Sequence, residues 1–184
     1  MRSLNWNAIQ ASGDGDFTPL PAGGYVVKIV DMTDEPKKEY VNLIWDIAEG
    51  EHAGRYSDKW GKEHPYAHNV ILSYKDTALG MLKGRLEAIQ ASNPGFDPFA
   101  AWDAGRLDMF KNRLMGVNLQ EEEYENQSGE VRTRLNVCQV IDAQRVRDGK
   151  VKVRPKKALA GKTGTSPTSS APADVYDGDI PFPV

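Results

Sequence analysis

The spacing of hydrophobic residues changes twice along this chain, and these changes constrain its fold more than any other feature. Apolar and polar residues alternate over 40–48, the period of two that is typical of a half-buried strand. Over 79–89 the apolar residues instead recur at the spacing of one helix face, with Asp76 as the expected N-cap. Alternation returns over 114–119 and 131–142. The sequence therefore predicts strands, then a helix, then strands.

Five strands are expected in total. A β-branched run over 25–30, bounded by glycine and aspartate, predicts the first strand, and 40–48 predicts the second. We expect the third strand to begin at Arg55, to break near 61–65 and to resume over 68–72. The two remaining strands follow the helix and form a hairpin.

The order of these elements indicates a mainly β fold with one or two helices. A helix between the third and fourth of five strands is the order of an OB-fold barrel. An α+β sandwich, or a barrel with another strand order, shares this element order. On the last strand, strict alternation places Arg134 and Cys138 on one face and Gln139 and Ile141 on the other.

Composition divides the chain into three parts. Residues 1–23 are rich in glycine, proline and aspartate, and predict an irregular lead-in. Residues 24–157 form the expected folded domain. Residues 158–184 begin with a stretch rich in alanine, glycine, serine, threonine and proline. Such a stretch buries too little apolar surface to order itself, so we expect a disordered tether with an acidic end.

Charge is distributed unevenly along the chain. Residues 1–144 carry 15 basic and 22 acidic residues, a net charge of −7, whereas 145–162 carry eight basic residues and one acidic residue, a net charge of +7. Residues 163–184 contain three aspartates and no basic residue. The basic segment favours a polyanionic partner. The single cysteine, the polar start and the lack of a long apolar run lead us to expect a cytoplasmic protein that does not enter membranes.

Patterns for catalysis and metal binding are incomplete. Residues 160–163 match the end of a phosphate-binding loop, but Lys156 stands where that motif needs glycine. The three histidines lack the paired cysteines of a zinc site. The glutamates within 121–125 lead into a hairpin and lack the histidine or lysine of a nuclease site. We therefore expect no enzymatic activity, no metal and no cofactor.

The end of the chain places carboxylates before a short apolar wedge. Its residues are Asp177, Asp179, Ile180, Pro181 and Phe182. After a tether of this composition, the ending resembles the C-terminal tip of bacterial single-stranded DNA-binding proteins. The resemblance implies that these five residues recruit a replication or recombination protein, with affinity from the apolar side chains and steering from the aspartates. Two more residues follow Phe182 here, whereas the bacterial tip ends at that phenylalanine.

The body of the chain shows a second resemblance. The segment Leu-Pro-Ala-Gly-Gly-Tyr at 20–25, the turn over 49–55 and the late strand pair are similar to a phage-encoded family of single-stranded DNA-binding proteins. The similarity spans roughly 5–155. It implies an OB-fold that binds single-stranded DNA without sequence preference during replication or recombination, in the host-cell cytoplasm. The sequence leaves a homo-oligomer open.

Binding a single strand in this way needs cations for the phosphates and flat rings for the bases. We expect stacking from Tyr40, Trp60 and Tyr66. The expected phosphate contacts are Lys28, Lys59, Lys62, Arg132, Arg134, Arg145, Arg147, Lys150, Lys152 and Arg154. The structural alternative is that the rings belong to the core and the cations are only solvated. The functional alternative is a protein-interaction adaptor that binds no nucleic acid, which the acidic body favours.

Overall fold

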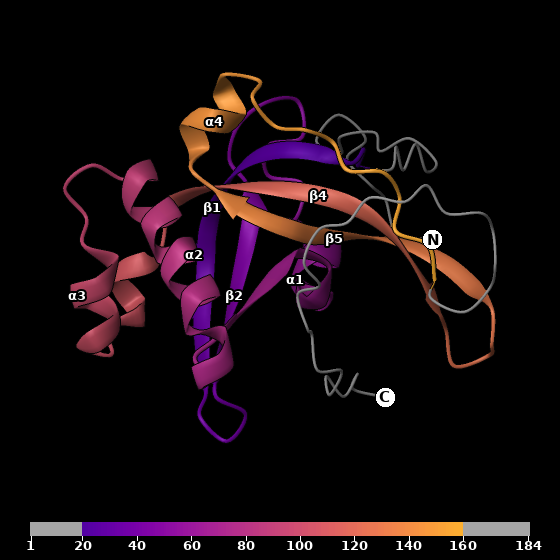
Figure 1. Cartoon of the computed structure of the whole chain (residues 1–184). Helices are drawn as coiled ribbons and strands as arrows, with labels where there is room; N and C mark the ends of the chain where they lie inside the picture. The colour runs from indigo at the N-terminus through magenta and orange to yellow at the C-terminus, as the bar shows by residue number, and fades with distance from the viewer. Residues whose placement is uncertain (1–19, 160–184) are drawn as a thin grey trace, which may run out of the picture.

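The computed structural model describes residues 20–159, which form a mainly β fold (Figure 1). Five antiparallel strands make one sheet in the order β3-β2-β1-β4-β5. The strands are β1 (Gly23–Glu35), β2 (Tyr40–Ile47), β3 (Asn69–Ser73), β4 (Leu114–Glu125) and β5 (Val131–Ile141). The α-helices of this part of the chain are α1 (Lys59–Glu63), α2 (Leu79–Ser92), α3 (Pro98–Asp103) and α4 (Ala143–Arg147). The predicted lead-in before residue 20, the tether and the acidic tip lie outside the described residues.

The sheet is open, whereas the sequence pattern predicts a closed barrel. Strands β3 and β5 lie at the two edges of the sheet order, and within residues 20–159 they form no ladder with each other. The predicted helix between the third and fourth strands is confirmed as α2, and α3 follows it. The fold is therefore an open sheet of five strands with few helices.

The third strand is shorter than predicted, because the chain turns and coils before it. Gly54 adopts a φ of +76°, which favours glycine, and a turn follows. The Asp58 side chain then accepts a hydrogen bond from the Gly61 amide and starts α1. Pro65 opens a 3₁₀ helix, Pro65–His68, so the strand begins only at Asn69. Likewise, Asp76 opens a 3₁₀ turn, and Ala78 takes the N-cap position of α2.

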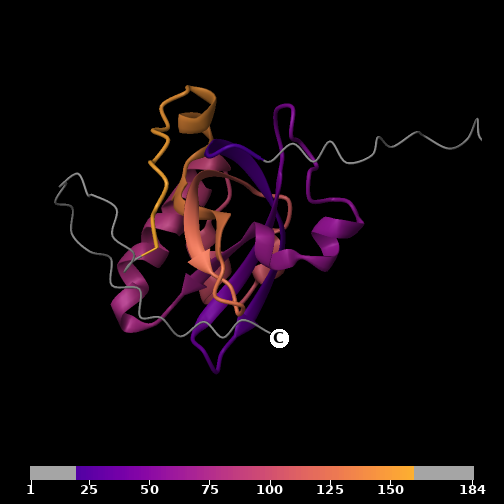
Figure 2. The same ribbon diagram turned by 90° about the vertical axis from the view of Figure 1, so that its right-hand side faces the viewer.

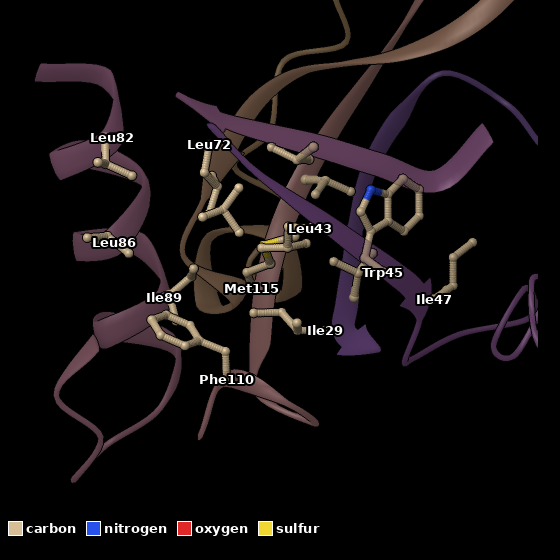
Figure 3. Close-up of a cluster of buried hydrophobic side chains, with 14 of the residues drawn as sticks. Ile29, Leu43, Trp45, Ile47, Leu72, Leu82, Leu86, Ile89, Phe110 and Met115 are labelled. Carbon is tan, nitrogen blue, oxygen red and sulfur yellow. The ribbon is translucent and has the colours of Figure 1, made fainter. Parts of the chain in front are cut away.

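One face of the sheet packs against α2 to form the core. Leu82, Leu86 and Ile89 project from α2 towards side chains of β1 to β4, as Figure 3 shows. The labelled strand residues of this core include Ile29, Leu43, Trp45, Leu72 and Met115. Full burial of each such side chain contributes about 1.5–3 kcal/mol. The helix that the hydrophobic spacing predicts is thus held by tertiary packing.

The opposite, outer face of the sheet is crossed by the chain after β5. The residues 148–159, which we call the strap, leave α4 and follow β4 along one side of the sheet (Figures 1 and 2). The Lys157 amide donates to the Glu121 carbonyl, and the Glu123 amide donates to the Lys157 carbonyl. These bonds use the edge of β4 beyond Leu119, where its ladder with β1 ends. The strap therefore extends the sheet by one short parallel bridge.

A β-bulge changes the faces of the last strand. Asn118 pairs with Gln139 and Leu119 pairs with Val137, so Cys138 is the extra residue on β5. As a result, Gln139 shares the outer face with Arg134, and the prediction of strict alternation along the whole strand is wrong. Arg134 lies on the outer face as predicted, opposite Glu122.

Candidate nucleic-acid interface

A groove of about 550 Å³ lies between the strap and the outer face of β4 and β5. Its floor is made by Asn118, Gln139 and Ile141. Its wall comes from α4 and the strap, namely Arg145, Lys150, Val151, Lys152, Val153, Arg154 and Pro155. Four of these residues are basic and none is acidic. We call Arg145, Lys150, Lys152 and Arg154 the groove cations.

The bulge and a glycine in β1 position the groove. The bulge turns Gln139 and Ile141 towards the strap and away from the core. Gly24 lets the strap come close to the sheet, since a Cβ at that position would lie 2.8 Å from Val151 Cγ2. The Asn118 side-chain amide donates a 2.9 Å hydrogen bond to the Lys152 carbonyl and fixes the middle of the strap. The bulge, the close packing of Val151 on Gly24 and the hydrogen bond from Asn118 together hold the groove cations beside the floor.

Within residues 20–159, only one of the four groove cations has a carboxylate partner. Lys150 Nζ lies 2.9 Å from Asp148, and this hydrogen bond raises the pKa of Lys150 and lowers that of Asp148. Arg145, Lys152 and Arg154 form no ion pair with any residue between 20 and 159. A groove that places such cations beside the side-chain amides of Asn118 and Gln139 suits an anionic chain.

Arg147 does not join this lining. Its guanidinium makes a two-pronged contact with the Glu49 carboxylate, at 2.6 Å and 3.1 Å. This hydrogen bond lowers the pKa of Glu49 and ties α4 to the turn after β2. The residue predicted as a phosphate contact thus serves in this structure to anchor α4.

The two arginines predicted on β5 are also paired with carboxylates. Arg132 Nη2 lies 2.9 Å from Glu130 at the tip of the β4–β5 hairpin. Arg134 Nη2 lies 3.1 Å from Glu122, and the Lys157 Nζ of the strap lies 2.8 Å from the same carboxylate. The Arg134 guanidinium also sits 5.2 Å from the Tyr124 ring centroid. These arginines share the sheet face that carries the groove, but further along β4.

The predicted stacking residues Trp60 and Tyr66 lie in a segment of clustered rings at 56–68. Trp60 stacks on His64 at 4.6 Å and faces Tyr56 at 6.4 Å between ring centroids. Tyr56 in turn stacks on the buried His68 at 4.5 Å. Tyr66 is the most exposed ring, with 68% of its surface accessible. Tyr66 therefore fits a stacking role better than Trp60, which is 42% exposed and whose ring already stacks on His64.

The ring segment and the groove approach each other at β5. A small cleft between β3 and β5 is lined by Tyr66 together with Leu135, Asn136 and Val137 of β5. The groove lies on the other side of the same strand, over Gln139 and Ile141. The open edge of β5 thus separates the most exposed ring from the groove cations.

The other predicted contacts lie elsewhere. Lys28 lies on β1 beside Asp46, and Tyr40 begins β2 at the far end of the β1–β2 ladder, where Lys38 lies over its ring. Lys59 and Lys62 are exposed on α1, and Lys59 pairs with Glu63 at 3.6 Å. The structure therefore brings the groove cations together but leaves Lys28 and Tyr40 apart from them.

Several residues of the interface have no signal in the linear sequence. Asn118, Gln139 and Asn136 are ordinary polar residues in predicted strands, and only the three-dimensional arrangement places them beside cations. His64 could have been suspected from the four-residue spacing of Tyr56, Trp60, His64 and His68, which repeats at roughly one helical turn.

Comparisons with known proteins add no relatives. No protein-family model matches this chain, and no curated protein matches it in sequence. Among residues 20–159, no three histidine, cysteine, aspartate or glutamate side chains come together as a metal site. The helices of this same region are all too short or too polar to cross a membrane.

Proposed function

We propose that this protein binds single-stranded DNA without sequence preference and acts, without catalysis, in phage-type replication or recombination. The groove carries this proposal, because it gathers four cations beside the side-chain amides of Asn118 and Gln139. Phosphate contacts dominate sequence-independent binding, and such binding needs clustered cations. Because residues 1–144 carry a net charge of −7, the groove cations offer an anionic strand a more favourable path than the acidic body does.

The strand order supports an OB-type scaffold within this proposal. Strand β1 pairs with both β2 and β4, and α2 lies between β3 and β4 in sequence, as in an OB-fold. The scaffold differs from a closed barrel in that β3 and β5 do not pair with each other within residues 20–159. OB-type proteins that bind a single strand combine a positive groove with exposed rings. Here Tyr66, across β5 from the groove, supplies an exposed ring.

The acidic tip at 177–182 recruits a replication or recombination protein in this proposal. Its resemblance to the bacterial tip supports this role. Deleting 174–184 should preserve DNA binding and abolish capture of the partner protein. A deletion that leaves both interactions intact would refute the role of the tip.

The main test compares DNA binding at several salt concentrations. Fluorescence anisotropy with labelled oligo-dT and with a duplex of equal length should show tighter binding of the single strand, and affinity should fall steeply with salt. Replacing Lys152 and Arg154 by alanine should make the slope of log K against log salt shallower by about 1.4, because each phosphate contact contributes about 0.7 for single strands.

The matched control replaces Lys37 and Lys111, two exposed lysines outside the groove lining, by alanine. This control makes the same change in net charge and should leave the slope nearly unchanged. Equal slopes for the two variants would show that the groove is not part of the DNA-binding interface. Complete absence of salt-dependent DNA binding by the unmodified protein would instead favour the protein-interaction adaptor, which the net charge of −7 over residues 1–144 supports.

A further inference from the structure

The Glu122 carboxylate is enclosed by hydrogen-bond donors from two other segments. Its Oε2 accepts from Arg134 Nη2 at 3.1 Å and from Asn136 Nδ2 at 3.2 Å. Its Oε1 accepts from Lys157 Nζ at 2.8 Å. Only 14% of the Glu122 side chain is exposed. Two cations and an amide thus converge on one anionic group.

This site continues the groove along the same face of β4. Asn118, Gln120 and Glu122 alternate onto the outer face, and Asn118 forms part of the groove floor. The Gln120 side chain donates to the Pro155 carbonyl, so the strap covers β4 between the groove and Glu122. Four residues of strand span about 13 Å, so the Glu122 site lies just beyond the end of the groove.

The donors around Glu122 are those that bind phosphate. A guanidinium, an ammonium and a side-chain amide bind phosphate oxygens with the same charge-assisted hydrogen bonds that they make to a carboxylate. Within the proposed path of the strand, Glu122 is therefore a negative charge that already occupies a phosphate-binding site.

We propose that Glu122 occupies the place of a backbone phosphate and is displaced when single-stranded DNA binds. A phosphate then takes the donors of Arg134, Asn136 and Lys157, and the carboxylate turns into solvent. This proposal rests on the proposed function and adds an internal competitor to it. In the free protein, the Glu122 carboxylate keeps Arg134 and Lys157 paired. It therefore lowers the affinity for DNA, because the phosphate must displace this carboxylate.

The test replaces Glu122 by glutamine and compares it with Glu87→Gln. Glu87 lies on α2, where it pairs with Lys83 at 3.6 Å, so the control makes the same charge change away from the strap. Anisotropy with oligo-dT should show at least fivefold tighter binding for Glu122→Gln at moderate salt. Its salt slope should stay close to that of the unmodified protein, because in both proteins the same cations end on the same phosphate.

The outcomes separate the two proposals. Glu87→Gln should bind within twofold of the unmodified protein. If Glu122→Gln behaves like Glu87→Gln or binds more weakly while the unmodified protein binds DNA, the displacement of Glu122 is refuted and the proposed function stands. If the unmodified protein binds no single-stranded DNA, the proposed function itself fails.

A second measurement on the unmodified protein does not depend on the folding of a variant. Burial raises the pKa of Glu122, but the hydrogen bonds from Lys157 and Arg134 outweigh it and hold this pKa below its ordinary value of 4.5. Once displaced, the carboxylate regains its ordinary pKa, so DNA binding at pH 4.5 should take up part of a proton at this site. Titration calorimetry with oligo-dT, in buffers of different ionisation enthalpy, measures this uptake. Thymine does not titrate in this range, so an uptake of zero would refute the proposal.

Discussion

At the scale of single residues, close approach decides where the strap lies. Gly24 has no side chain, and Val151 fills the space where one would be. The strap can then donate and accept hydrogen bonds along β4 while its cations face the groove. The close approach of Val151 requires glycine at position 24, whereas the backbone conformation there does not.

Replacing Gly24 by alanine should destabilise the protein by about 1–3 kcal/mol, because the new methyl group overlaps Val151. Urea unfolding measures the loss, and trypsin should cleave faster at Lys150 and Lys152. The matched control is Gly84→Ala on the exposed side of α2, where a Cβ meets no other atom within 4 Å. That control should stabilise the protein by about 0.5–1 kcal/mol, since alanine favours helix more than glycine does. A neutral effect of Gly24→Ala would mean that the strap does not rest on β1.

At the scale of elements, the strap is held to β4 by carboxylates as well as by its backbone. Glu122 binds Lys157, and Glu123 lies 2.8 Å from Lys156 Nζ. The hydrogen bond from Lys156 also lowers the pKa of Glu123. Consecutive side chains of β4 therefore hold consecutive lysines of the strap, and the two backbone hydrogen bonds of Lys157 lie between them.

Replacing Lys156 and Lys157 together by alanine should loosen the strap without unfolding the sheet. Two partly exposed ion pairs contribute about 1 kcal/mol together, which corresponds to about fivefold faster hydrogen exchange in the strap. Mass spectrometry of peptides covering 148–159 measures this rate. The paired change of Lys37 and Lys111 to alanine serves again as the control and should leave the rate as it is. An unchanged rate in the double variant would assign the docking of the strap to its backbone and Val151 alone.

The sequence pattern predicts the regular elements well and their exceptions poorly. Period two identifies β2 and much of β4, and the leucine spacing identifies α2, because burial on one face imposes these periods. The bulge at Cys138 follows from pairing across two strands, and no local residue type announces it. The basic segment is expected from sequence to supply phosphate contacts, and the structure places four of its residues, Arg145, Lys150, Lys152 and Arg154, along one groove. The pairing of Arg147 with Glu49 joins residues 98 positions apart, which no sequence pattern shows.

At the scale of the whole molecule, α2 links the two edge strands of the sheet, β3 and β5, which form no ladder with each other within residues 20–159. It contacts β3 and β5 as well as β4, so one helix connects both edges through the core. Ile89 is fully buried at the end of this helix and lies close to Phe110 (Figure 3). The stability of the open sheet therefore depends on the packing of α2.

Ile89→Ala should cost about 2–5 kcal/mol of unfolding free energy, because it leaves a cavity between the helix and the sheet. Leu79→Ala provides the comparison, since Leu79 begins the same helix but is 46% exposed, and its loss should cost at most about 0.5 kcal/mol. Chemical denaturation followed by circular dichroism measures both. Similar small effects for the two variants would show that α2 contributes little to holding the edges together.

The bulge at Cys138 also divides β5 into two halves that tolerate different substitutions. Before it, odd-numbered residues such as Leu135 and Val137 pack on the core and even-numbered residues point outward; after it, Gln139 and Ile141 point outward instead. Substitutions at Leu135 and Val137 are therefore tolerated only if they preserve volume. In the second half, Gln139 is exposed and lines the groove, so substitutions there can change the chemistry of the groove without disturbing the core, whereas Ile141 is buried and should keep its volume. A mutational library of this strand is therefore best designed with a different set of allowed residues on each side of Cys138.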